Sequence, residues 1–106
     1  MFWIRHTDDS DEDDPPLAAL SDLYAELSTL DREHGEVSVT NDDIDWCVSA
    51  HRDGRVVLVR RDVDEDQHMF PVDRERVIEI WRRLVDGDVA GLLREPWKAG
   101  YTSTDG

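Results

Sequence analysis

One cysteine and one histidine stand close together in the middle of the sequence, in the pattern Cys47-x-x-x-His51. A thiol and an imidazole can act as nucleophile and general base, or as two ligands of a zinc ion. On a β-strand, four residue steps separate them by about 13 Å, far beyond the roughly 3 Å that proton transfer requires. Zinc also lacks support, because no second cysteine and no His-x-x-x-His spacing occurs. We therefore interpret Cys47 as a structural thiol and assign no catalytic and no metal-binding residue.

The other histidines, His6, His34 and His68, belong to no local pattern of serine or carboxylate residues that defines a reaction. The sequence has no glycine-rich phosphate-binding loop and no Gly-x-Ser-x-Gly elbow. We therefore expect no cofactor and a protein that is not an enzyme. A small enzyme that uses clustered carboxylates is the alternative.

Carboxylate or amide oxygens alternate with other residues in three segments, 9–13, 41–45 and 62–66. An EF-hand calcium loop also needs glycine at its sixth position and glutamate at its twelfth. The three segments have instead, at those two positions, Asp14 and Leu20, Trp46 and Arg52, and Gln67 and Asp73. No dedicated calcium loop is predicted, although a divalent-cation-dependent module built on these carboxylates stays open as part of the same alternative.

Acidic residues dominate the charge, with 26 Asp and Glu against 12 Lys and Arg and a net charge of −14. Such a surface repels nucleic-acid phosphates and anionic lipids, so we expect neither a nucleic acid nor a membrane as partner. A basic protein is the partner that this charge favours. A further alternative is that the acidic excess serves only solubility or salt adaptation, in which case it assigns no function.

A length of 106 residues is typical of a single domain, and we expect one α+β domain over residues 1–106. The first residues lack the basic and apolar pattern of a secretory signal. No apolar stretch approaches the roughly 20 residues that cross a bilayer. Together with the single cysteine, these features favour a protein of the cytoplasm.

The first part of the chain predicts a strand over residues 2–6, an acidic loop over 7–14 and then a helix. Asp14 is the expected N-cap of this helix, and Gly35 is expected to end it. Apolar and polar residues alternate after Gly35, which predicts strands near residues 36–40, 44–51, 55–61 and 68–72.

A second helix is predicted to begin after Asp73, because apolar residues recur on one broad face until Gly87. Residues 101–106 are expected to be a frayed tail. The predicted fold is α+β, with an antiparallel meander of four to five strands, two main helices on one face, and the order β-α-β-β-β-β-α.

The dipeptide Asp53-Gly54 is typical of a two-residue hairpin turn and predicts the register of the strands around it. In that register Trp46, Val48 and Ala50 face the helices. They share this face with Arg61, Val59 and Val57 on the next strand. Cys47, Ser49 and His51 then lie on the second face with Arg60, Leu58 and Val56. If no helix covers it, this second face is a candidate homodimer surface.

A meander places the turn after residue 41 and the loop after residue 61 at the same end of the sheet. The carboxylates gathered there are the expected partner-binding residues, and we name them the acidic pole: Asp42, Asp43, Asp45, Asp62, Asp64, Glu65 and Asp66. The order of elements in a small acidic domain is similar to that of several bacterial toxin-immunity proteins. The likeness implies an inhibitor that blocks a basic partner by complementary charge.

Overall fold

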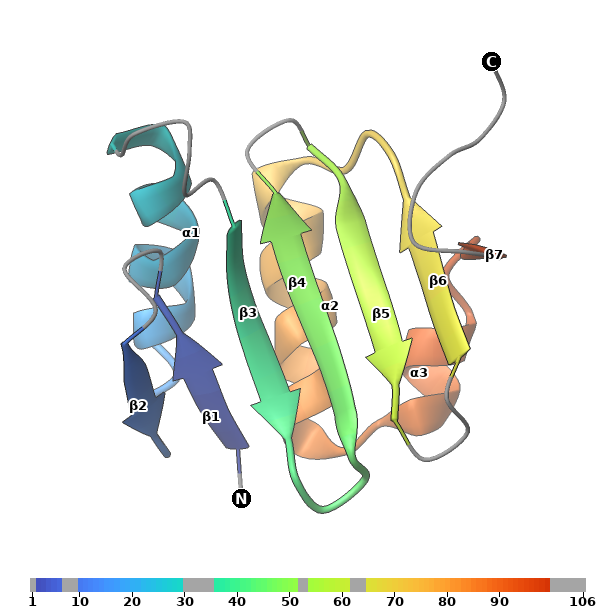
Figure 1. Cartoon of the computed structure of the whole chain (residues 1–106), viewed down its shortest axis with the longest axis horizontal. Coiled ribbons are helices and arrows are strands. Elements are labelled where there is room, and N and C mark those ends of the chain that lie inside the picture. The colour runs from blue at the N-terminus through green and yellow to red at the C-terminus, as the bar shows by residue number, and fades with distance from the viewer. Residues whose placement is uncertain (1, 7–9, 30–35, 52–53, 62–64, 100–106) are drawn as a thin grey trace.

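A computed structural model describes residues 2–6, 10–29, 36–51, 54–61 and 65–99 of the chain. The strands form a single antiparallel sheet in the order β2-β1-β3-β4-β5-β6-β7, and the helices lie behind it on one face (Figure 1). The strands are β1 (Phe2–Arg5), β2 (Asp11–Asp13), β3 (Glu36–Asn41), β4 (Trp46–His51), β5 (Val56–Arg60), β6 (Glu65–Met69) and β7 (Lys98–Ala99). The helices are α1 (Ala19–Thr29), α2 (Arg74–Asp86) and α3 (Val89–Leu93).

The predicted fold class is confirmed: the chain is α+β, and its antiparallel sheet is mostly a meander with helices packed against it. Two short strands were not expected. β2 lies within the segment predicted as an acidic loop, and β7 is only two residues long. All three side chains of β2 are exposed and acidic, so the sequence lacks the alternation of apolar and polar residues by which a strand is predicted. It exists because Trp3, Ile4 and Arg5 of β1 pair with it.

Helix α1 begins later than predicted. Asp14 has a positive φ of 46° and does not cap the helix, which starts at Ala19 after a turn in which Ala19 N donates to Pro16 O. The predicted end at Gly35 lies outside the described residues. Helix α2 begins as predicted, because the side chain of Asp73 accepts a hydrogen bond from Arg76 N. It ends at Gly87, whose φ of 73° lies in the left-handed region.

The hydrophobic core lies between the helices and one face of the sheet. Two buried polar contacts fix α2 on this face: Trp81 Nε1 donates to Val48 O at 3.1 Å, and Asn41 Nδ2 donates to Leu84 O at 2.8 Å. The largest fully buried side chains are Trp81, Ile4, Leu20, Leu23, Leu58, Ile80, Leu84, Leu92, Val37, Val39, Val48 and Val56. Trp46, Val48 and Ala50 belong to this core, as predicted.

The predicted register of the β4–β5 hairpin is wrong by one residue. His51 N donates to Arg55 O at 2.8 Å, and Gly54 N donates to His51 O at 3.0 Å, so the loop contains residues 52–54. Gly54, with φ of 99°, takes the left-handed position that ends a three-residue loop. Ala50 therefore pairs with Val56, Val48 with Leu58 and Trp46 with Arg60.

This shift turns the side chains of β5 over. Val56 and Leu58 point into the core, whereas Val57 and Val59, which were expected there, lie on the opposite face beside Ser49 and Cys47. The face prediction for β4 is unaffected.

Candidate functional site

The sheet face turned away from the helices, here called the open face, is the surface on which the strands bring distant residues together. Among the described residues no helix packs on it (Figure 1). Its centre consists of small or β-branched side chains from three neighbouring strands: Ser38, Thr40, Cys47, Ser49, Val57 and Val59. Longer charged side chains stand around them.

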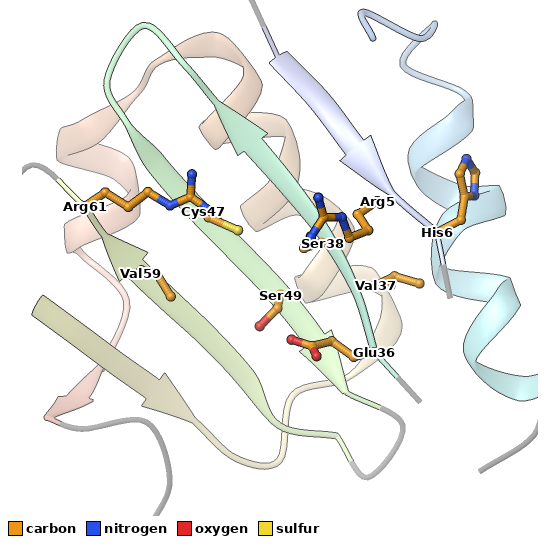
Figure 2. A pocket seen from close by; sticks show the side chains of 9 residues that line it. All are labelled: Arg5, His6, Glu36, Val37, Ser38, Cys47, Ser49, Val59 and Arg61. Carbon is orange, nitrogen blue, oxygen red and sulfur yellow. The ribbon is translucent and has the colours of Figure 1, made fainter. Parts of the chain in front are cut away.

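A shallow groove of about 240 Å³ crosses this face over β3 and β4. Figure 2 shows Arg61 reaching toward Cys47 from one end, Arg5 reaching toward Ser38 from the β1 side, and Glu36 at the far end beside Ser49. The complete lining is Arg5, His6, Glu36, Val37, Ser38, Cys47, Ser49, Val59 and Arg61. Sequence reasoning identified Cys47 in this place but not the charged residues, which come from other strands.

Cys47 forms part of the floor of the groove and is 8% exposed. Burial raises the pKa of the thiol above its ordinary value, and this effect outweighs the opposite influences of the Thr40 hydroxyl, the Arg61 charge and the Ser38 hydroxyl. The thiol is therefore protonated at neutral pH and is a poor nucleophile.

His51 does not contact Cys47. It contacts a serine and a glutamate, which are residue types that also occur with histidine in the active sites of hydrolases. Its Nε2 lies 3.3 Å from Ser49 Oγ and 3.6 Å from Glu36 Oε2, while its Nδ1 lies 3.2 Å from Arg55 Nη2. A guanidinium group only donates, so Nδ1 must be the acceptor and Nε2 carries the proton of the neutral ring. That proton points toward Ser49. His51 is therefore in the wrong tautomer to remove a proton from the serine, which argues against a Ser-His nucleophile.

His6 follows β1 and joins it to two other elements. Its Nδ1 lies 2.6 Å from Glu26 Oε2 on α1, and its Nε2 lies 3.3 Å from Glu12 Oε1 on β2. Burial alone would lower the pKa of His6, but hydrogen bonds and charge attraction to Glu26 and Glu12 outweigh burial and raise it above 6.5. The sequence did not reveal this contact, because Glu26 lies 20 residues away.

The predicted acidic pole is only partly described. Asp42, Asp43 and Asp45 are exposed in the turn between β3 and β4. Arg61 N donates to Asp45 O at 3.0 Å, which ties this turn to the end of β5. Asp42 Oδ1 also accepts a hydrogen bond of 3.1 Å from Trp3 Nε1.

The remaining pole residues belong to β6 or to the connection before it. Glu65 begins β6 opposite Arg60, and Asp66 is exposed on the open face beside Val59. Asp62 and Asp64 lie outside the described residues. Within the described ranges, no group of three or more His, Cys, Asp or Glu side chains could hold a metal ion.

Comparison of the chain with protein-family models, curated proteins and solved structures finds no match in any of the three. None of the helices that the structure describes has the length and apolar character needed to cross a membrane.

Proposed function

We propose that the protein is a non-enzymatic cytoplasmic domain that binds a basic protein through its acidic pole, in the manner of an immunity-protein-like inhibitor. The observation that carries the proposal is the arrangement of the β3–β4 turn. Three exposed carboxylates, of Asp42, Asp43 and Asp45, stand on this turn, and the contact between Asp45 O and Arg61 N brings it to the end of β5.

Electrostatics supports a protein partner of opposite charge. Like charges gathered at one end of a molecule repel each other and lower its stability, and a basic partner removes that repulsion on binding. The same field accelerates the encounter with a basic protein and repels nucleic acid. The protonated Cys47 thiol and the tautomer of His51 give no support to the enzyme alternative.

The test compares three forms of the protein as bait for a soluble extract of the native host. One is wild type, and the second has Asp42, Asp43 and Asp45 changed to Asn. The third is a matched control with the same charge change on the outer side of α2: Glu75→Gln, Glu79→Gln and Asp86→Asn, all exposed. Both variants change the net charge from −14 to −11, because each loses three negative charges.

A protein that binds wild type and the α2 control, but not the turn variant, is the partner expected from the proposal. Purified with the bait, it should bind with an affinity that falls as salt rises, and the turn variant should have a smaller salt dependence. The proposal is wrong if every captured protein binds the two variants equally, because net charge alone would then explain capture. That outcome favours solubility or salt adaptation.

A further inference from the structure

The open face has a charge balance unlike that of the rest of the chain. Its described basic side chains are Arg5, Arg55, Arg61 and Lys98, and its described acidic side chains are Asp11, Asp13, Glu36 and Asp66. Four positive charges against four negative ones leave these residues of the face without net charge, whereas the chain carries −14. Most of the repulsion between two copies therefore originates from other surfaces, and the open face is where they can approach at least cost.

The size and relief of the face suit another flat surface. The molecule measures 33 × 29 × 23 Å, and Figure 1, viewed down the shortest axis, shows the open face spread over the two longer dimensions. The centre of the face is closely packed, because Thr40 and Val57 are fully buried and Ser49 and Cys47 are only 5% and 8% exposed, so a second copy would contact mainly the exposed residues around this centre. Ser38, Cys47 and Ser49 in its centre are small, and two sheets pack face to face about 10 Å apart.

Charges of opposite sign mark the two ends of the groove. Arg61 stands at the end next to β5, and Glu36, whose side chain is 51% exposed, stands at the other end at the start of β3 (Figure 2). In a twofold dimer the contacts are reciprocal: if residue i of one subunit contacts residue j of the other, then residue j of the first subunit also contacts residue i of the second. A twofold axis lying between the two sheets, perpendicular to the line from Arg61 to Glu36, places each Arg61 over Glu36 of the other copy.

A small anion fits the groove less well. Arg5 already binds both carboxylate oxygens of Asp11, at 2.8 and 3.3 Å, and Glu36 adds a negative charge to the lining. A cationic ligand would meet both guanidinium groups. The alternation of charge along the groove matches a copy of the same pattern better than it matches a ligand of one sign.

We propose that the open face is a self-complementary surface that binds a second copy of this chain, with Arg61 and Glu36 forming reciprocal ion pairs. The dimer contact rests on Arg61 and Glu36, whereas the proposed function is carried by the carboxylates of the β3–β4 turn, so the two proposals are tested with different substitutions.

Charge reversal tests the pairing. Arg61→Glu puts two glutamates at the ends of the groove, and Glu36→Arg puts two arginines there, so neither variant can pair with itself. A mixture of the two variants restores both pairs, because Glu at position 61 of one chain faces Arg at position 36 of the other, and Glu36 of the first faces Arg61 of the second. Sedimentation equilibrium at about 0.15 M salt, where the Debye length is about 8 Å, measures association.

The expected result is a dimer for wild type, at least a tenfold weaker dimer for each single variant, and recovery in the mixture. Net charge alone predicts a different order. Glu36→Arg makes the net charge less negative, from −14 to −12, and Arg61→Glu makes it more negative, from −14 to −16, because each exchange changes the charge by two. If repulsion between whole molecules controlled association, Glu36→Arg would dimerise more strongly than wild type.

Control exchanges on the helix side of the molecule, Glu79→Arg and Arg82→Glu, should dimerise within threefold of wild type, since both side chains are exposed on α2. Circular dichroism confirms that each variant is folded. A wild-type protein that is monomeric throughout overturns the proposal, and so does a mixture of folded variants that associates no better than either alone. Both results leave the bait experiment on Asp42, Asp43 and Asp45 unaffected.

Discussion

Asn41 connects the sheet to helix α2 through both ends of its side-chain amide. Its Nδ2 donates to Leu84 O, and its Oδ1 accepts from Asp43 N at 2.8 Å. Asn41 is 3% exposed, so any group left without its partner there has no access to bulk water. This one side chain holds both the last turn of the helix and the first residues of the β3–β4 turn.

Replacing Asn41 with Ala should lower the free energy of unfolding by about 2 kcal/mol, because the Leu84 carbonyl and the Asp43 amide both lose a partner. Urea unfolding measures the change. Ser38→Ala is the control: Ser38 is half-buried on the other face of β3, three residues before Asn41, and its loss should change the value by less than about 0.5 kcal/mol. Equal effects of the two substitutions would contradict the role given to Asn41.

His6 should make stability depend on pH. Its pKa in the folded protein is raised above 6.5, so folding favours the protonated ring. This contribution is fully present below pH 6.5 and is lost as the pH rises through the folded value. Wild type should therefore lose stability over this interval relative to His6→Gln, whose neutral amide does not titrate. Urea unfolding at a series of pH values gives the difference, and parallel curves for the two proteins would disprove the link.

At the candidate site, the sequence predicted correctly that Cys47, Ser49 and His51 share one face of a strand, because alternation within a strand is local. It did not predict that Glu36, Arg5 and Arg61 line the same groove. Those contacts depend on the registers of β1, β3 and β5, which are set by turn geometry and by packing rather than by neighbouring residues.

At the level of the elements, β4 and β5 differ in how strongly their sequences specify a face. In β4 the residues Trp46, Val48 and Ala50 alternate with more polar ones, so the core face was predictable. In β5 the four residues Val56, Val57, Leu58 and Val59 are all apolar, and either register turns two of them toward the helices. Loop length decided between the two registers. Asp53-Gly54 is compatible with loops of two or three residues, because glycine can take the left-handed position in both.

Gly54→Ala tests that loop. The φ of 99° strains any residue with a Cβ, although the nearest atom to an added Cβ, Pro71 Cβ, would be 3.6 Å away in ordinary contact. The expected loss of stability is about 1–2 kcal/mol, due to backbone strain alone. Thermal unfolding followed by circular dichroism measures it. A neutral effect would mean that the loop adopts another conformation than the one described.

At the level of the whole molecule, the net charge of −14 is the feature that most affects stability. Repulsion among exposed carboxylates opposes the compact state, and salt screens it. The melting temperature should rise as salt increases from about 0.01 M to about 0.3 M, as the Debye length falls below about 10 Å. The variant with Asn at positions 42, 43 and 45 should melt higher than wild type in low salt and respond less to added salt. An identical salt response in both proteins would show that the turn carries no unusual share of the repulsion.

The two outer strands of the sheet determine how the chain can associate at all. β2 is three residues long and wholly acidic, and β7 is two residues long. A short strand with repelling charges is a poor template for another strand, so neither border of the sheet invites the backbone pairing that leads to fibrils. β1 has no such defence, since three of its four residues are Phe2, Trp3 and Ile4. The acidic strand β2 therefore covers the backbone edge of the aromatic strand β1. A chain that lacked β2 should aggregate through the exposed edge of β1, even if its core remained folded.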